Sequence, residues 1–301
     1  MDACKVYIPY MRRTKLELAM PEIMEFFWNS PLKAFRKMQI AAIFSSHRSE
    51  WRLPAGMTFT SFLEFLIDKN ILREIPIPSE HYSDEKRYIL GNASIYAIAL
   101  SLKPKSYLTH GSAVVLHGLT DQIPKTVYLN YEQSPKPQGG GLTQEGIDRA
   151  FANRQRQSKL TYRYEDFQIV VINGKHTNRL EVTQLPGTDG ELLDVTKLER
   201  TLIDIAVRPT YASGVVQVLE VFERAKPLMS VNTLIATLKT LNYVYPYHQV
   251  IGFYMEKAGY PVSQWQKLLK LGLQFDFYLT YQLPVDKKYD PKWRLYYPSG
   301  L

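Results

Sequence analysis

The stretch TFTSFLEFLIDKNILREIPIPSEHYSDEKRYILG, residues 58–91, decides the fold prediction. Its first part, 58–70, places apolar residues at helical spacing, and Ser61 with Glu64 has the spacing of a capping box. Two short alternating segments, 71–77 and 87–91, then flank a polar turn. This pattern predicts an amphipathic helix followed by an antiparallel hairpin.

Two further helical patterns precede this stretch. Residues 21–29 and 37–51 each carry an apolar face, and the Pro- and Gly-containing link after them ends the second helix. Three helices followed by a hairpin are typical of a winged helix-turn-helix, in which the third helix enters the major groove and the hairpin is the wing. The alternative is a small α+β domain that makes only protein contacts.

The predicted third helix carries Glu64 and Asp68 and only Lys69 as a cation, so phosphate contacts would come from its neighbours. Polar side chains at the start of the helix could read bases. The candidate DNA-binding residues are Arg48, Arg52, Arg73, Lys86 and Arg87 for phosphates, with Thr58, Thr60 and Ser61 for bases.

The rest of the chain predicts a larger mixed α/β domain. Strands are expected near 126–131 and 160–185, a mobile Pro/Gly-rich loop at 134–146 and a basic helix at 147–159. Helices dominate from 195 to 271, and strands close the chain. The predicted fold class is therefore α+β, with a winged helix-turn-helix domain at 1–95 and a larger domain at 96–301.

Composition places this chain among ordinary folded proteins. It has 301 residues, 45% hydrophobic residues, a formal net charge of +8 and a pI near 9.2. The basic excess favours an acidic partner such as nucleic acid. One cysteine, Cys4, excludes a disulfide framework, and no signal peptide or membrane-spanning run is apparent. The expected location is the cytoplasm.

The stretch YLTHGSAVVLHGLTDQIP, residues 107–124, raises the question of catalysis. His110 and His117 are seven residues apart, which would separate them by about 10 Å along a helix and prevent them from sharing one metal ion. We interpret both as packed histidines at helix ends. Asp121 lacks the second carboxylate that a two-metal nucleotidyltransferase site needs. Glu181 lacks the lysine of a nuclease motif.

No P-loop, nucleophile elbow or Cys/His pair occurs either. The prediction is therefore a protein without catalytic residues, metal or cofactor. An enzyme that acts on nucleotides through 107–124 is kept as a third hypothesis.

Two charged segments have other interpretations. In KLERTLIDIAVRP, residues 197–209, Asp204 lies four residues after Arg200, and a solvated, salt-bridged helix is expected there. The basic run within 147–159 could contact phosphate or an acidic partner, or form a solvated face. Its candidate contact residues are Arg149, Arg154, Arg156 and Lys159.

Together these segments resemble the AbiEi family of antitoxins and transcriptional regulators in type IV toxin–antitoxin systems. The similar pieces are His-Gly-Leu-Thr at 117–120, Glu-Arg-Thr-Leu-Ile-Asp at 199–204 with Arg208-Pro209, and the helix from Ile251-Gly252 to Glu256. The resemblance implies a winged helix that binds inverted repeats in its own promoter. It also implies a C-terminal domain that neutralises a nucleotidyltransferase toxin.

The leading hypothesis is therefore a DNA-binding autoregulator that is also an antitoxin. Its expected partners are its own promoter DNA and a cognate toxin, with no membrane. The alternative is a protein-interaction module whose winged helix is a docking surface without specific DNA binding.

Overall fold

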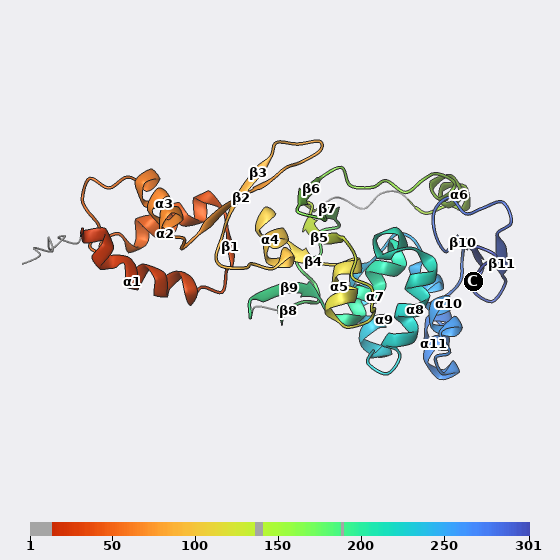
Figure 1. Cartoon of the computed structure of the whole chain (residues 1–301). Coiled ribbons are helices and arrows are strands. Elements are labelled where there is room, and N and C mark those ends of the chain that lie inside the picture. Colours follow the sequence, from red (N-terminus) through yellow and green to blue (C-terminus); the bar gives the residue numbers. More distant parts are fainter. Residues whose placement is uncertain (1–13, 136–140, 188–189) are drawn as a thin grey trace, which may run out of the picture.

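The computed structural model describes residues 14–135, 141–187 and 190–301 as an elongated molecule of mixed helices and sheets (Figure 1). An N-terminal helical unit lies at one end, a six-stranded sheet in the middle and the C-terminal helices at the other end (Figure 1). This arrangement confirms the α+β composition. Within the described ranges, no helix is long and apolar enough to cross a membrane.

The N-terminal unit consists of three helices and a small antiparallel sheet. Its sheet has the order β1-β3-β2. Phe27, Phe44 and Phe62 are buried between the helices, and Trp51 stacks on Phe62. In chain order the elements are α1 (Lys15–Trp28), β1 (Ala34–Phe35), α2 (Lys37–His47), α3 (Phe59–Asp68), β2 (Arg73–Ile77) and β3 (Glu85–Ile89).

Two helix starts in this unit differ from the sequence prediction. Helix α1 begins six residues before Pro21, because Thr14 and Glu17 form a capping box at its N-terminus. Helix α3 is capped by Thr58, whose hydroxyl accepts from the Ser61 backbone N–H. The capping box predicted from Ser61 and Glu64 is therefore wrong, since Thr58 lies one turn earlier and takes the cap position.

Helix α4 (Ile95–Leu102) and the tip of the β2–β3 hairpin connect this unit to the central sheet. Ile75 and Ile89 of the hairpin share one hydrophobic cluster with Ile98 of α4 and Leu129 of the central sheet. At the hairpin tip, the Arg163 N–H donates to the Pro78 carbonyl at 2.9 Å. The predicted boundary at residues 95/96 thus lies inside a shared core.

The central sheet is mixed, with the strand order β6-β7-β5-β4-β9-β8. β5 pairs in parallel with β7, and β4 with β9, whereas the other neighbours are antiparallel. Successive side chains point to opposite faces. Ile169 and Val171 of β7 therefore face the cluster with α4, whereas Val170 and Ile172 face Tyr211. The strands are β4 (Tyr107–Leu108), β5 (Thr126–Glu132), β6 (Thr161–Tyr164), β7 (Phe167–Gly174), β8 (Val182–Pro186) and β9 (Leu192–Thr196).

The C-terminal part packs its helices around the largest hydrophobic cluster. A small sheet, β10-β12-β11, closes the chain. The elements are α5 (His110–Leu116), α6 (Gln144–Ala152), α7 (Leu198–Val207), a 3-10 turn η1 (Pro209–Ala212), α8 (Val215–Ala225), α9 (Val231–Leu241), α10 (Tyr247–Lys257), α11 (Val262–Leu269), β10 (Phe277–Tyr278), β11 (Lys288–Asp290) and β12 (Leu295–Tyr297).

The basic helix predicted at 147–159 is wrong in its second half. Helix α6 ends at Ala152, and the following residues run extended because they bond to other elements. Gln155 accepts from Thr210, and the Ser158 hydroxyl donates to the Val171 carbonyl. The four basic candidates do not lie on one helix: Arg149 is exposed on α6, and Arg154, Arg156 and Lys159 are exposed on the extended segment. Positions 136–140 of the loop predicted to be mobile lie outside the described residues.

A glycine in α10 receives the most buried tryptophan. A Cβ atom at Gly252 would lie 2.0 Å from the Trp293 indole ring, so only glycine fits there. The same helix face holds Trp293 by hydrogen bonds. Its indole N–H donates to Glu256 at 2.6 Å, and Gln249 donates to its carbonyl at 2.6 Å. These contacts attach the C-terminal segment to the helical core.

We expect Gly252→Ala to destabilise the protein by about 1–3 kcal/mol or more, because the methyl group forces Trp293 out of its site. Urea denaturation followed by tryptophan fluorescence measures this loss. Gly56→Ala is the matched control, since no atom lies within 4 Å of a Cβ at that position. Equal unfolding midpoints for the two variants would contradict the packing argument.

Candidate functional sites

Helix α3 presents a short polar stretch at its N-terminus. Thr60 and Ser61 are exposed there, whereas Phe62 and Leu66 are buried in the N-terminal core. The Thr58 hydroxyl is occupied by its cap and by a 2.9 Å contact with the Ser61 hydroxyl. Thr60 is thus the predicted base-reading residue with no hydrogen bond from its side chain to the described part of the chain.

The predicted phosphate contacts differ in their availability. Arg52 and Arg73 are exposed. Arg48 is half-buried, lies 5.4 Å from the Phe44 ring centre and donates to the carbonyls of Pro54 and Ala55. Lys86 is exposed but pairs with Glu74 at 2.6 Å. Arg52 and Arg73 are therefore the most accessible of these cations.

Arg87 is not available to DNA in this structure, which corrects the sequence prediction. Its side chain is buried between β3 and α4. The guanidinium donates to the carbonyls of Ser101 and Leu102 at the C-terminus of α4, and it pairs with Glu85 at 2.9 Å. Carbonyls at a helix end lack partners within the helix, so Arg87 satisfies them and fixes α4 against the hairpin.

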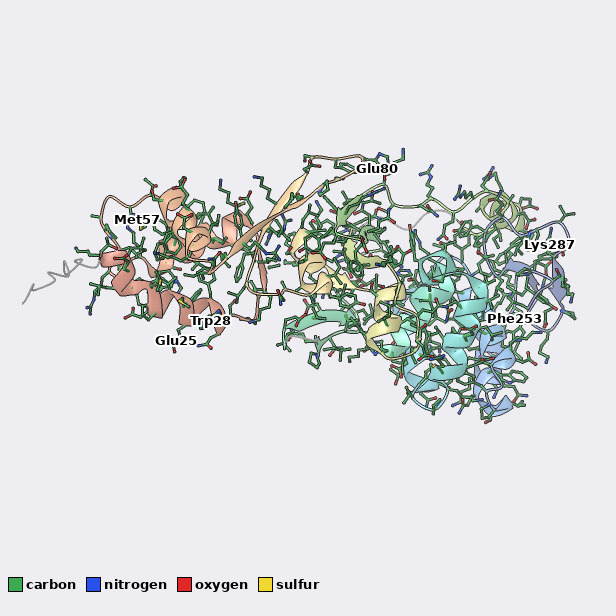
Figure 2. All side chains as sticks on the ribbon, in the orientation of Figure 1. Glu25, Trp28, Met57, Glu80, Phe253 and Lys287 are labelled. Carbon is green, nitrogen blue, oxygen red and sulfur yellow. The ribbon has the colours of Figure 1, made fainter. Side chains whose placement is uncertain are left out.

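The charge of the N-terminal unit is balanced. Residues 14–91 contain ten Lys and Arg and ten Asp and Glu, so their formal net charge is zero. Large apolar side chains are also exposed on this unit. Trp28 lies at the surface of α1 (Figure 2) and is 61% exposed, and Met38 on α2 is 84% exposed.

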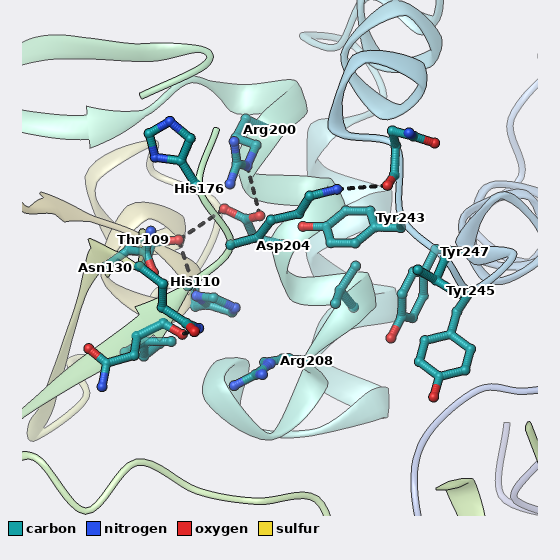
Figure 3. A pocket seen from close by; sticks show the side chains of 18 of the residues that line it. Thr109, His110, Asn130, His176, Arg200, Asp204, Arg208, Tyr243, Tyr245 and Tyr247 are labelled. Atoms are coloured by element: carbon teal, nitrogen blue, oxygen red, sulfur yellow. Dashed lines mark hydrogen bonds and ion pairs between the residues drawn. The ribbon is translucent and has the colours of Figure 1, made fainter. Parts of the chain in front are cut away.

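A second candidate site is a cavity of about 520 Å³ between the central sheet and the C-terminal helices (Figure 3). β5 and β7 end at its wall, and α7, the α9–α10 link and the start of α5 form the other walls. Ligands in α/β proteins commonly bind beyond the carboxyl ends of parallel strands. The cavity volume is within the usual range for small-molecule sites.

A buried ion pair forms one wall of this cavity. Arg200 Nε donates to Asp204 Oδ1 at 2.8 Å, and both residues are about 5% exposed. The other Asp204 oxygen accepts from the Thr109 hydroxyl at 3.0 Å. The helix and the Arg200–Asp204 pair predicted here are confirmed, but the prediction that the pair is solvated is wrong, because this face of α7 packs against the β4–α5 junction.

The contacts of Thr109 determine which nitrogen of His110 carries the proton. A hydroxyl has one hydrogen, and Thr109 gives it to the Asp204 carboxylate, which can only accept. The Thr109 oxygen, 3.1 Å from His110 Nδ1, therefore accepts from that nitrogen. Nε2 of the neutral ring then carries a lone pair. Burial lowers the pKa of His110 to about 4, so the ring is neutral at pH 7.

Two cations of this cavity have no carboxylate partner among the described residues. Arg208 lies 5.8 Å from the Tyr211 ring centre and makes no ion pair there. Lys175 Nζ donates only to the carbonyls of Leu241 and Asn242, and burial lowers its pKa. Asp204 is the one carboxylate in the lining, and Arg200 already balances its charge.

Tyrosines form the opposite wall. Tyr243 and Tyr245 lie in the α9–α10 link, Tyr247 begins α10, and Tyr281 lies in the segment after β10. Burial raises the pKa of Tyr243 and of Tyr247, so these phenols stay neutral. The wall is therefore aromatic and uncharged.

His117 is separate from this cavity. It ends α5, and its Nε2 lies 2.7 Å from the Thr196 carbonyl. His110 and His117 thus occupy opposite ends of one helix with different partners, as the sequence interpretation expected. In the part of the chain that is described, no group of three or more His, Cys, Asp or Glu residues could hold a metal ion.

Sequence reasoning missed this cavity because its residues come from six separate segments. Arg200, Asp204 and His110 were each singled out, yet nothing in their spacing brings α7 to the β4–α5 junction. The Thr109-His110-Gly111 turn has an unusual backbone conformation. His110 has a φ of +49°, and a Cβ at Gly111 would lie 3.0 Å from the Tyr211 carbonyl.

No protein-family model and no curated protein matches this chain. Among solved structures, the crystal structure of the RV2827C protein from Mycobacterium tuberculosis is similar, with a TM-score of 0.56 and 13% sequence identity. The similarity covers 93% of this chain and 91% of that one. At this identity the likeness shows the fold alone, and it extends over both the N-terminal unit and the larger part.

We expect Asp204→Ala to cost about 3–5 kcal/mol, because it leaves the buried Arg200 charge without a partner. Asp121→Ala is the matched control. Asp121 also pairs with an arginine, Arg224 at 2.6 Å, but its side chain is 86% exposed and the pair is screened by water, so its loss should change stability far less. Urea denaturation measures both, and equal losses would contradict the burial argument. The double variant Arg200→Met/Asp204→Leu should recover most of the stability.

The lowered pKa of His110 also predicts a pH dependence. Between pH 6.5 and about 4 the unfolded chain binds a proton at His110 and the folded chain does not, so stability is lost as the pH falls through this window. His110→Asn removes the titration, and asparagine tolerates the positive φ. Wild type should lose about 1.4 kcal/mol per pH unit relative to this variant. Parallel stability curves of the two proteins would contradict a neutral, buried His110.

Proposed function

We propose that this protein is a DNA-binding autoregulator that also acts as an antitoxin against a nucleotidyltransferase-type toxin. The observation that carries the DNA-binding half is the element order of the N-terminal unit. Helix α1, strand β1, helices α2 and α3 and the β2–β3 hairpin follow one another, and the strands form one antiparallel sheet. We interpret this order as a winged helix-turn-helix, in which α3 would be the recognition helix.

Fewer residues are available for DNA contact than the sequence predicted. Arg87 is removed from it, and Arg48 is held by its own loop. The surface keeps Arg52, Thr60 and Ser61, which are exposed around the start of α3. Phosphate contacts from Arg52 would orient the unit, and the two hydroxyls would read base edges.

The antitoxin half rests on the resemblance of 117–120, 199–204 and 251–256 to the AbiEi family. These segments lie in the larger part of the chain, away from α3 (Figure 1). DNA binding and toxin neutralisation would thus use different surfaces of one protein, so each can be lost without the other.

A gel-shift titration tests the DNA-binding half. We expect wild type to shift DNA from upstream of its own gene more tightly than scrambled DNA, with affinity falling as salt rises. Arg52→Ala should weaken binding to both DNAs and reduce the salt slope by about 1. Thr60→Ala/Ser61→Ala should reduce the preference for the specific DNA.

Lys267→Ala, an exposed lysine on α11 at the far end of the molecule, is the control and should change neither property. Thr58 is left intact in all variants because its loss would uncap α3. Equal, weak binding of wild type to both DNAs would refute the proposal.

One observation favours docking as the second candidate function. The N-terminal unit has no net charge over residues 14–91 and exposes Trp28 and Met38. A protein surface would match this better than a polyanion would. In that case wild type would show no DNA preference, and the product of the neighbouring gene would co-elute with it but not with a Trp28→Ala/Met38→Ala variant.

A further inference from the structure

The cavity beside Arg200 and Asp204 is built from side chains that the proposed DNA and toxin surfaces do not use. Its lining combines cationic side chains with tyrosines, and the Lys175 ammonium group lies 5.6 Å from the Tyr243 ring centre. Figure 3 shows Arg208 and His110 on one side of the space and Tyr243, Tyr245 and Tyr247 on the other. Such a division favours a ligand that has an anionic group and a flat ring.

Arg208 is the strongest single indication of an anionic ligand. It lines the cavity at the end of α7, and among the described residues it has no ion pair or side-chain hydrogen bond. Lys175 lies beside the tyrosines, where its ammonium group donates to the Leu241 and Asn242 carbonyls and sits over the Tyr243 ring. The Arg208 guanidinium is suited to phosphate, since phosphate accepts several charge-assisted hydrogen bonds.

The tyrosine wall suits the ring of such a ligand. Tyr243 and Tyr247 pack edge to face with ring centres 5.4 Å apart, and Tyr245 packs edge to face on Tyr247 at 6.2 Å. This mutual packing holds the wall rigid, and rigid aromatic side chains stack on nucleobases. His110 Nε2 adds a hydrogen-bond acceptor, which a ribose hydroxyl or an exocyclic amine could satisfy.

We propose that this cavity binds a nucleoside phosphate, with its phosphate at Arg208 and its base on the tyrosine wall. The ligand is either a free mononucleotide or the phosphorylated terminal nucleotide of a nucleic acid, because both present the same groups. This site is distinct from the double-helical DNA surface proposed for α3, and neither depends on the other.

Isothermal titration of the full chain with the four nucleoside 5′-monophosphates tests the proposal. At least one should bind with one-to-one stoichiometry, and its nucleoside and inorganic phosphate should each bind at least tenfold more weakly. Arg208→Gln should weaken the nucleotide about tenfold to a hundredfold while leaving the nucleoside unchanged, because a charge-assisted hydrogen bond is lost. Tyr243→Leu should weaken nucleotide and nucleoside together.

Arg224→Gln is the matched control, since Arg224 is an exposed arginine on α8 whose partner, Asp121, lies outside the cavity lining. It should bind like wild type, and the unfolding midpoint of each variant should show that it is folded. A 5′-phosphorylated single-stranded oligonucleotide that binds more tightly than the monophosphate, and loses that binding in Arg208→Gln, would identify a nucleic-acid end as the source. No binding of any monophosphate at millimolar concentration, or equal binding by wild type and Arg208→Gln, would overturn the proposal.

Discussion

The buried pair between Arg200 and Asp204 sets where the elements around the cavity can lie. Two charges removed from water need each other and need further hydrogen bonds. Asp204 obtains one from Thr109, and Arg200 obtains one from the Leu180 carbonyl at 3.2 Å. The pair therefore connects α7 to the β4–α5 junction and to the segment before β8. Asp204 accepts from Thr109, and Thr109 in turn contacts His110 Nδ1. The ion pair therefore positions His110 at the cavity wall as well as connecting the surrounding elements.

Contacts of the β2–β3 hairpin likewise hold the N-terminal unit against α4 and the central sheet. Arg87 reaches from β3 to the end of α4, and the hairpin tip pairs with β6 through the bridge between Ser79 and Tyr162. A hairpin held along β3 and at its tip cannot swing independently of the central sheet. If the unit binds DNA, the start of α3 must make most of the contacts, and the rest of the molecule must turn with it.

Much of the helical architecture was predictable because its periodicity is local. The helices predicted to dominate residues 195–271 are α7 to α11, and the predicted hairpin segments 71–77 and 87–91 overlap β2 and β3. The errors occur where distant contacts override local preference. The segment after Ala152 is extended because Gln155 and Ser158 bond to Thr210 and Val171. The exposure of Thr60 follows from the helical pattern of α3 and could be predicted from the sequence. The burial of Arg87 and the position of the cavity depend on contacts between distant elements, which local periodicity does not reveal.

The segments that resemble the AbiEi family contain residues that connect one element to another. Glu199 accepts from the Ser230 N–H at the start of α9, His117 approaches the Thr196 carbonyl, and Gly252 admits Trp293. Each connects two elements of the larger part. Arg208 also belongs to the similar segments, but it lines the cavity without an ion pair among the described residues. Arg208 and the exposed start of α3 are therefore the groups on which the proposals for nucleotide and DNA binding rest.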